Sequence, residues 1–242
     1  MVQVLAINSS PHMGKGFTAM ILKQFLKGMK EKGAEIELFY TSKLNINPCK
    51  GCLTCWFSAE KKCSQRDDMD IILPKIADAD IFIVASPIYV DGITGPMKNL
   101  IDRMLPLLDP YVELRNGHCR HPVREYSRPG KVVLVSSCAW WKVDNFDPMI
   151  MYIKAMCANM GREFAGALVR PYAGGMMYLK STGKNIDDIF EATREAGQEL
   201  IEKGEISIDN LKTISRELVP LDLYIKVFNQ NMKDNVKSVR EK

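Results

Sequence analysis

Short apolar runs alternate with longer amphipathic stretches along most of this chain. Five runs have the length and composition of strands, and they span residues 2–7, 35–40, 80–85, 131–135 and 163–169. The stretches that follow them place apolar residues three or four positions apart, as amphipathic helices do. These predicted helices span residues 17–32, 67–77, 94–107, 146–160 and 186–203. Strands that alternate with helices favour a doubly wound α/β fold with a five-stranded parallel sheet.

Three further segments do not belong to this alternation. Residues 45–66 form a loop that contains four cysteines, and residues 109–130 form a basic insertion too irregular to assign to an element. Residues 206–242 are amphipathic and predict a helical extension in two parts, which separate near Pro220. We therefore expect one main domain over residues 1–205, followed by a C-terminal helical extension.

The composition is that of a globular protein with one well-buried core. The 242 residues are 46% hydrophobic and 26% charged, with a formal net charge of +4. No basic stripe alternates with aromatic residues, so nucleic acid is not an expected partner. No basic leader precedes Val2, and no apolar run approaches the roughly 18 residues of a spanning helix. These features predict a cytoplasmic protein without membrane contact.

Polar or aromatic residues gather where three of the predicted strands end. They occupy residues 9–18, 86–92 and 136–141. In an open parallel sheet, ligands bind outside the carboxyl ends of the strands, at the point where the strand order reverses. We therefore expect these three loops to converge on one ligand.

The first of these loops has the composition of a phosphate-binding loop. It joins a buried strand to a helix and carries the hydroxyls of Ser9, Ser10 and Thr18. Hydroxyls and free N–H groups at the start of a helix favour an anion. The spacing matches neither a Walker loop nor a dinucleotide-binding loop, so a compact monophosphate such as that of FMN fits best. The alternative is that the hydroxyls only cap the helix.

Four of the seven cysteines lie close together, at Cys49, Cys52, Cys55 and Cys63. Their C-x2-C-x2-C-x7-C spacing supplies three thiols from a short segment and a fourth just beyond, as a [4Fe-4S] cluster requires. Free or redox-active thiols are one alternative, and zinc is another, although structural zinc more often uses two separated C-x2-C pairs. Such crowding favours a reducing compartment over a secreted disulfide framework.

Several motifs together resemble one known family. They are Ser9-Ser10-Pro11 with Gly16-Phe17-Thr18, Ser86-Pro87-Ile88-Tyr89, and Pro96-Met97-Lys98 with Asp102-Arg103. Over residues 2–203 the chain is similar to the NADPH-dependent FMN reductase and iron-sulfur flavoprotein branch of the flavodoxin-like superfamily. The resemblance implies a flavodoxin-like sheet, bound FMN, and a cysteine motif like the compact one of iron-sulfur flavoproteins.

By position, the resemblance assigns FMN binding to the three strand-end loops. The implied residues are Ser9, Ser10, Pro11, Lys15, Gly16, Phe17, Thr18, Pro87, Ile88, Tyr89, Val90, Gly92, Ser137 and Cys138. Phe17 and His12 replace the asparagine and arginine that are usual in the family. We therefore expect Phe17 to offer only its backbone N–H and Lys15 to supply the positive charge. The cofactor itself would carry the redox chemistry, so no catalytic side chain is assigned.

The predicted function is that of an FMN-dependent oxidoreductase, which passes electrons from NAD(P)H or a reduced protein donor such as ferredoxin to an acceptor. One alternative is a non-enzymatic electron carrier, similar to flavodoxin, with a [4Fe-4S] cluster and a ferredoxin partner. A thiol- or zinc-based regulator without flavin is another.

The resemblance also bears on assembly and on the remaining charged and aromatic residues. It implies a homodimer or homotetramer with the flavin near the interface. The cysteine loop is expected on the same edge of the sheet as the flavin loop. The basic insertion is interpreted as a site for an acidic partner, the NADPH phosphate or a second subunit, or as solvated surface. Trp140 and Trp141 are candidates for dimer packing, and Lys98, Asp102 and Arg103 for a structural ion network.

Overall fold

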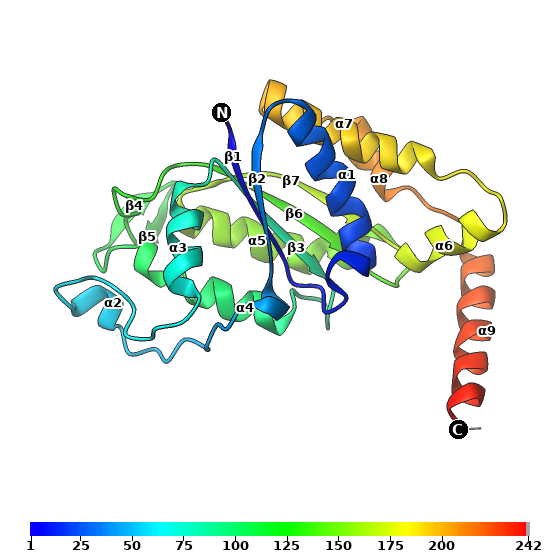
Figure 1. The fold of residues 1–242 in the computed structure, drawn as a ribbon, viewed down its shortest axis with the longest axis horizontal. Coiled ribbons are helices and arrows are strands. Elements are labelled where there is room, and N and C mark those ends of the chain that lie inside the picture. The colour runs from blue at the N-terminus through cyan, green and yellow to red at the C-terminus, as the bar shows by residue number, and fades with distance from the viewer. Residues whose placement is uncertain (241–242) are drawn as a thin grey trace.

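A five-stranded parallel sheet forms the centre of the computed structural model, which describes residues 1–240 (Figure 1). The strands are β1 (Gln3–Asn8), β2 (Glu35–Tyr40), β3 (Ile81–Pro87), β6 (Lys131–Ser137) and β7 (Glu163–Arg170). They stand in the order β2-β1-β3-β6-β7, and all four pairings are parallel. The predicted doubly wound sheet is confirmed, and its strand order is the flavodoxin-like one.

Helices cover both faces of this sheet (Figure 1). One face carries α1 (Phe17–Glu31), α7 (Asp187–Lys203) and α8 (Ile208–Ser215), and the other carries α3 (Met69–Asp78), α4 (Gly95–Asp102) and α5 (Asp147–Met160). Alternate residues of a strand point to opposite faces, so Val4 and Ala6 of β1 join one core and Leu5 and Ile7 the other. This double covering explains why the central strands are almost wholly apolar.

The predicted helix over residues 94–107 is divided in the structure. α4 ends at Asp102, and a short 3₁₀ turn, η3, covers Leu105–Leu107. Pro106 explains the break, because its ring lacks an N–H group and clashes with the carbonyl four residues earlier in a continuous helix.

The basic insertion contains a small hairpin that the sequence interpretation left unassigned. Its strands are β4 (Glu113–Arg115) and β5 (His118–Arg120), which pair antiparallel. Asn116 and Gly117 form the turn, with φ of 53° and 78°. An Asn-Gly pair is a strong signal for such a turn, because both central residues need positive φ.

The C-terminal extension has the predicted two parts, α8 and α9 (Leu221–Arg240), and residues 241–242 lie outside the described residues. Ile214, Val219 and Tyr224 belong to the same core as α1 and α7, so the start of the extension packs on the main body. The C-terminal end of α9 extends away from the main body (Figure 1). Within residues 1–240, no helix combines the length and the apolar composition needed to cross a membrane.

Arg170 ties this extension to the sheet. It is fully buried at the end of β7 and donates from Nε to Pro171 O at 2.8 Å and from Nη1 to Ile214 O at 2.5 Å. A third bond runs from Nη2 to Arg216 O. Burial lowers the pKa of Arg170 to about 10, so the guanidinium stays charged near neutral pH. The two last acceptors are carbonyls at the end of α8, which otherwise lack partners within the helix.

Candidate functional site

A cavity of about 370 Å³ opens where the carboxyl ends of the strands meet, and we call it the strand-end cavity. Six residues predicted to bind FMN line it, namely Phe17, Pro87, Ile88, Tyr89, Ser137 and Cys138. They come from the start of α1 and from the ends of β3 and β6. The expected convergence of the three loops is therefore observed.

The loop after β1 lies at the base of this region and is held by buried hydrogen bonds. Ser9 donates from N and from Oγ to Ala85 O, at 2.8 and 3.2 Å, which fixes the loop to the end of β3. Thr18 Oγ1 and Ser137 Oγ lie 2.8 Å apart and join the first loop to the third. Ser9, Ser10 and Thr18 are all at least 96% buried. The hydroxyls are thus placed by the fold.

The start of α1 offers free backbone donors at this site. Its N-cap residue is Gly16, and no side chain caps the helix. The alternative that the loop hydroxyls only cap the helix is therefore not supported. The first N–H groups of a helix have no partner within it and favour an anion. A Cβ on Gly16 would lie 2.7 Å from Ser10 Oγ, so glycine permits the close approach of these two loop residues.

Other predicted residues lie around the cavity without lining it. Pro11 and Lys15 are exposed on the first loop. Tyr89 and Gly92 close a tight turn through two backbone hydrogen bonds, at 2.9 and 3.2 Å. Val90 lies at the tip of this turn, is 99% exposed and does not line the cavity.

The Val90 turn stores conformational strain. Val90 has φ of 47°, in the left-handed region that β-branched residues rarely adopt. Val90→Asn is expected to raise the free energy of unfolding by about 1 kcal/mol, because asparagine tolerates this region. Urea denaturation measures the change, with Val112→Asn as a control at an exposed valine of ordinary φ. Equal stability of the Val90 variant and the wild type would contradict the strain argument.

The structure adds cavity residues that the sequence interpretation missed. Ala139 extends the third loop, Tyr172, Ala173, Gly174 and Tyr178 follow β7, and Phe228, Asn231 and Met232 come from α9. The rule that ligands bind at strand ends could have pointed to residues 172–174, because β7 ends at Arg170. No local signal places α9 at the cavity.

The two tryptophans of the third loop pack against this chain's own extension. Trp141 Nε1 donates to Val219 O at 2.8 Å. The ring of Trp140 stacks on Phe228 with 6.3 Å between ring centroids, and its side chain remains half exposed.

The cysteine loop contacts the basic insertion and the residue just before it. Trp56 Nε1, from α2 (Thr54–Phe57), donates to Leu108 O at 3.0 Å. Arg124 is 5% exposed and donates to Cys55 O at 3.0 Å. At least this arginine of the insertion is therefore internal and structural.

The four cysteines share this loop without forming a metal geometry in the described conformation. Cys49 and Cys52 are exposed, Cys63 is half-buried and Cys55 is buried. Within residues 1–240, no group of three Cys, His, Asp or Glu side chains stands in a metal-binding arrangement. Burial raises the pKa of the Cys55 thiol, and charge on Cys63, Cys49 and Cys52 raises it further, so the sulfurs are close enough to interact. Hydrogen bonds from Ser64 and Thr54 lower the pKa of Cys52 to about 7.

Two features of these residues suit a cluster, namely their thiol groups and the backbone conformation of the loop. Gly51, Leu53 and Lys61 all have positive φ, between 51° and 65°. Left-handed residues turn a short chain sharply, which lets several thiols of one loop face a common centre. The donor set therefore suits a thiolate-bound cluster.

The cysteine loop and the strand-end cavity are separate regions of one chain. No residue of 45–66 lines the cavity. Figure 1 shows α2 and α9, which contributes to the cavity, at opposite ends of the longest axis.

The predicted network of Lys98, Asp102 and Arg103 is only partly present. Lys98 Nζ pairs with Asp102 at 2.6 Å on the surface of α4. Arg103 pairs instead with Asp67, at 2.7 Å, next to the cysteine loop. The reason is its position directly after α4, where the chain turns toward the interior.

Comparisons with known proteins show which families this chain is similar to. The sequence profile of the NADPH-dependent FMN reductase family matches residues 2–118. An iron-sulfur flavoprotein of Methanocaldococcus jannaschii is 36% identical over 115 residues, which cover 48% of this chain and 58% of that protein. One of Archaeoglobus fulgidus is 27% identical over 226 residues, which cover 90% of this chain and 94% of that protein. The chain is therefore similar to the NADPH-dependent FMN reductase family over its first half and to iron-sulfur flavoproteins over most of its length.

A solved structure supports the fold of this chain. The FMN-dependent NADH-azoreductase of Bacillus anthracis, in complex with FMN, superposes with a TM-score of 0.60 at 16% identity. The superposition covers 84% of this chain and all of that one. The predicted flavodoxin-like fold is thereby confirmed.

The part of the chain that matches the FMN reductase profile contains the phosphate-type loop, the cysteine loop and the end of β3. The remaining walls of the strand-end cavity, after β6 and β7 and on α9, lie outside the matched residues.

Proposed function

We propose that this protein is an FMN-dependent oxidoreductase, which passes electrons from NAD(P)H or a reduced protein donor through FMN to an acceptor. The observation that carries the proposal is the strand-end cavity, where a largely apolar chamber adjoins a buried hydroxyl loop and an uncapped helix start. A flavin has the matching shape, with an apolar ring system at one end and a phosphate at the other. The match of residues 2–118 to the FMN reductase family supports this assignment.

The phosphate end would be held by the first loop. Ser9, Ser10 and Thr18 would supply hydroxyls there, and Phe17, the first residue of α1, would supply its backbone N–H. Lys15 is exposed beside the loop and would supply the charge that the family usually takes from arginine.

The ring end would lie in the strand-end cavity. The backbone N–H groups of Val90 and Asp91 would face its polar edge, because those of Ile88, Tyr89 and Gly92 are already hydrogen-bonded. Tyr89 and Phe17 would border its surface. Bound FMN supplies hydride or electron transfer, while the protein orients the ring and excludes water. Cys138 has a pKa raised by burial, so it would remain a neutral thiol at this site.

We further propose that Cys49, Cys52, Cys55 and Cys63 hold a [4Fe-4S] cluster. Support comes from their spacing, from the left-handed residues between them, and from relatives named iron-sulfur flavoprotein. With a cluster present, a one-electron donor such as ferredoxin becomes plausible, and FMN would convert one-electron into two-electron chemistry. Because the cysteine loop does not line the cavity of its own chain, we propose transfer to the FMN of a second subunit in a homodimer or homotetramer.

An anaerobic visible spectrum of the untagged protein, with iron and sulfide assays, tests the proposal. We expect flavin bands over a broad cluster absorbance and about four irons per chain. Turnover of NADPH in the presence of an electron acceptor then separates a reductase from a non-enzymatic carrier.

Each outcome of this measurement is informative. A protein that neither contains flavin nor binds added FMN would contradict both redox functions. Protein that contains flavin but no iron would agree with the proposed oxidoreductase and would contradict the proposed [4Fe-4S] cluster. Unchanged iron content in Cys52→Ala would show that iron is bound elsewhere.

A further inference from the structure

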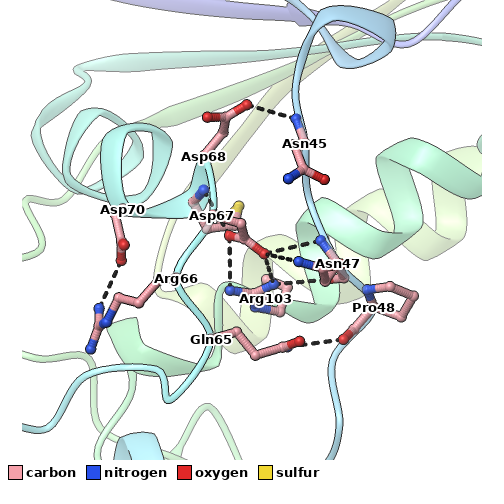
Figure 2. Close-up of polar contacts among 10 residues, drawn as sticks. Asn45, Asn47, Pro48, Gln65, Arg66, Asp67, Asp68, Asp70 and Arg103 are labelled. Atoms are coloured by element: carbon pink, nitrogen blue, oxygen red, sulfur yellow. Dashed lines mark hydrogen bonds and ion pairs between the residues drawn. The ribbon is translucent and has the colours of Figure 1, made fainter.

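Polar contacts join the two ends of the cysteine loop, and we call this region the loop neck (Figure 2). Asn45 N donates to Asp68 Oδ2 at 2.6 Å, and Asn47 N donates to Asp67 Oδ2 at 3.0 Å. Gln65 Nε2 also donates to Pro48 O, at 3.0 Å. All four cysteines of the motif lie between these ends, so the loop neck sets the limits of the segment that would hold a cluster.

One residue from outside the loop closes the neck. Arg103 donates from Nη1 to Asn47 O and to Asp67 Oδ2, both at 2.7 Å, and from Nη2 to Asp67 Oδ1 at 3.1 Å (Figure 2). The side chains of Arg103 and Asp67 are 1% and 0% exposed. Burial alone would raise the pKa of Asp67, but hydrogen bonds from Arg103, Asn47 and Met69 lower it to about 2. The pair is therefore a charged, bidentate clamp across the neck.

The clamp leaves one donor of Arg103 without a partner. Its Nε atom is buried and makes no hydrogen bond within residues 1–240. Buried donors without partners are rare, because they lose their hydrogen bonds to water and gain nothing in return. The unused Nε–H therefore calls for a group that the described residues alone do not supply.

Cys63 is the cysteine of the motif that shares a cavity with Arg103. Arg103 and Cys63 line one cavity of about 440 Å³, together with Lys61, Arg66 and Tyr126. Burial lowers the pKa of Arg103, whereas contacts with Asp67 and with the Cys63 sulfur raise it, and the net change is upward. The charged guanidinium and the thiol that completes the cysteine motif therefore share one cavity.

We propose that Arg103 is a positioning residue of the cluster site, which clamps the loop neck through its terminal nitrogens and directs its Nε–H toward the Cys63 sulfur. The inference rests on the proposed [4Fe-4S] cluster. Net charge and hydrogen bonds to the sulfurs both set the reduction potential of such a cluster. Since a positive charge and an N–H donor favour the more negative, reduced form, Arg103 raises this potential.

The test is an anaerobic potentiometric titration of the cluster in the full-length, flavin-loaded protein, followed by electron paramagnetic resonance. Iron and sulfide are assayed on the same samples. Arg103→Lys keeps the charge but removes the Nε–H and the two-pronged clamp. We expect lower iron content and a cluster potential shifted to more negative values. A neck that was merely loosened would admit water and shift the potential to more positive values.

Two further variants complete the design. Asp67→Asn removes the neutralising carboxylate but keeps the Nε–H and the charge of Arg103, so we expect a shift to more positive potential. Arg66→Gln is the matched control, because Arg66 lines the same cavity with its side chain 61% exposed and paired with Asp70. We expect wild-type potential and iron content in this control.

The outcomes separate this inference from the proposed function. Wild-type protein with flavin but without iron would remove the cluster, and the role of Arg103 with it. The wild type must first be shown to contain the cluster. If the cluster potential of Arg103→Lys is then unchanged or more positive, only the role of Arg103 is overturned. If the Arg103→Lys protein binds no iron, it has no cluster potential to measure, and the Asp67→Asn variant becomes the test. An unchanged cluster potential in Asp67→Asn would also overturn the proposal.

Discussion

Arg170→Met is expected to lower the free energy of unfolding by about 3 kcal/mol, because three buried carbonyl groups lose their donor. The acceptors are the carbonyls of Pro171, Ile214 and Arg216, which tie the end of α8 to the sheet. Methionine fills most of the volume without donating a hydrogen bond. The relief of a buried charge offsets part of the loss, so the change stays below the sum of three unpaired groups.

The same variant should loosen the C-terminal extension. Phe228, Asn231 and Met232 of α9 line the strand-end cavity, so we expect faster proteolysis after α8 and weaker FMN binding. Guanidinium denaturation and limited proteolysis measure these effects. Arg194→Met is the control, because the ion pairs of Arg194 with Glu31 and Glu191 lie at the surface and should contribute little. Wild-type stability of Arg170→Met would show that the carbonyls find other partners.

The sheet could be predicted because each strand carries its own signal. The apolar run of β3 and the alternation of β2 are local patterns, and the observed bounds agree with the predicted ones within two residues. The strand ends followed from the same patterns, since polar residues come directly after apolar ones. That is why six of the predicted site residues line one cavity.

The partners of the buried arginines could not be predicted in this way. Arg170 bonds to carbonyls 44 and 46 residues away, and Arg103 to Asp67, 36 residues away. An arginine that binds backbone carbonyls leaves no pattern in the sequence, because any residue supplies the acceptor. For the same reason, Arg124 was counted with the surface charge of the insertion, although it is buried against Cys55.

The α9 residues that line the strand-end cavity are a second feature that the sequence pattern could not predict. The apolar positions of α9 are spaced as in any amphipathic helix, and nothing local states which surface they cover. The packing of Tyr224 against Tyr172, with 4.7 Å between ring centroids, and the stacking of Phe228 on Trp140 bring this helix to the cavity. Contacts of this kind depend on tertiary structure rather than on periodicity.

Gly16→Ala is expected to weaken FMN binding by about 2 kcal/mol, which is an increase in Kd of about 30-fold. Gly16 has φ of −78° and ψ of 164°, which any residue adopts, so the cost is steric and not conformational. A Cβ at this position would lie 2.7 Å from Ser10 Oγ and 3.1 Å from His12 Cβ. The loop would have to move away from the start of α1, and its hydroxyls would leave the proposed phosphate position.

Gly14→Ala, in the same loop, separates this effect from a general loss of flexibility. A Cβ on Gly14 would meet only Tyr40 Oη, at 3.3 Å, and the end of the Lys23 side chain, at 3.9 Å. These atoms can move aside, so we expect wild-type affinity in fluorescence titrations with FMN. Equal losses in both variants would mean that the loop responds to any added side chain. Wild-type affinity in a folded Gly16→Ala protein would show that the phosphate binds elsewhere, because the crowded Ser10 hydroxyl could not then be one of its donors.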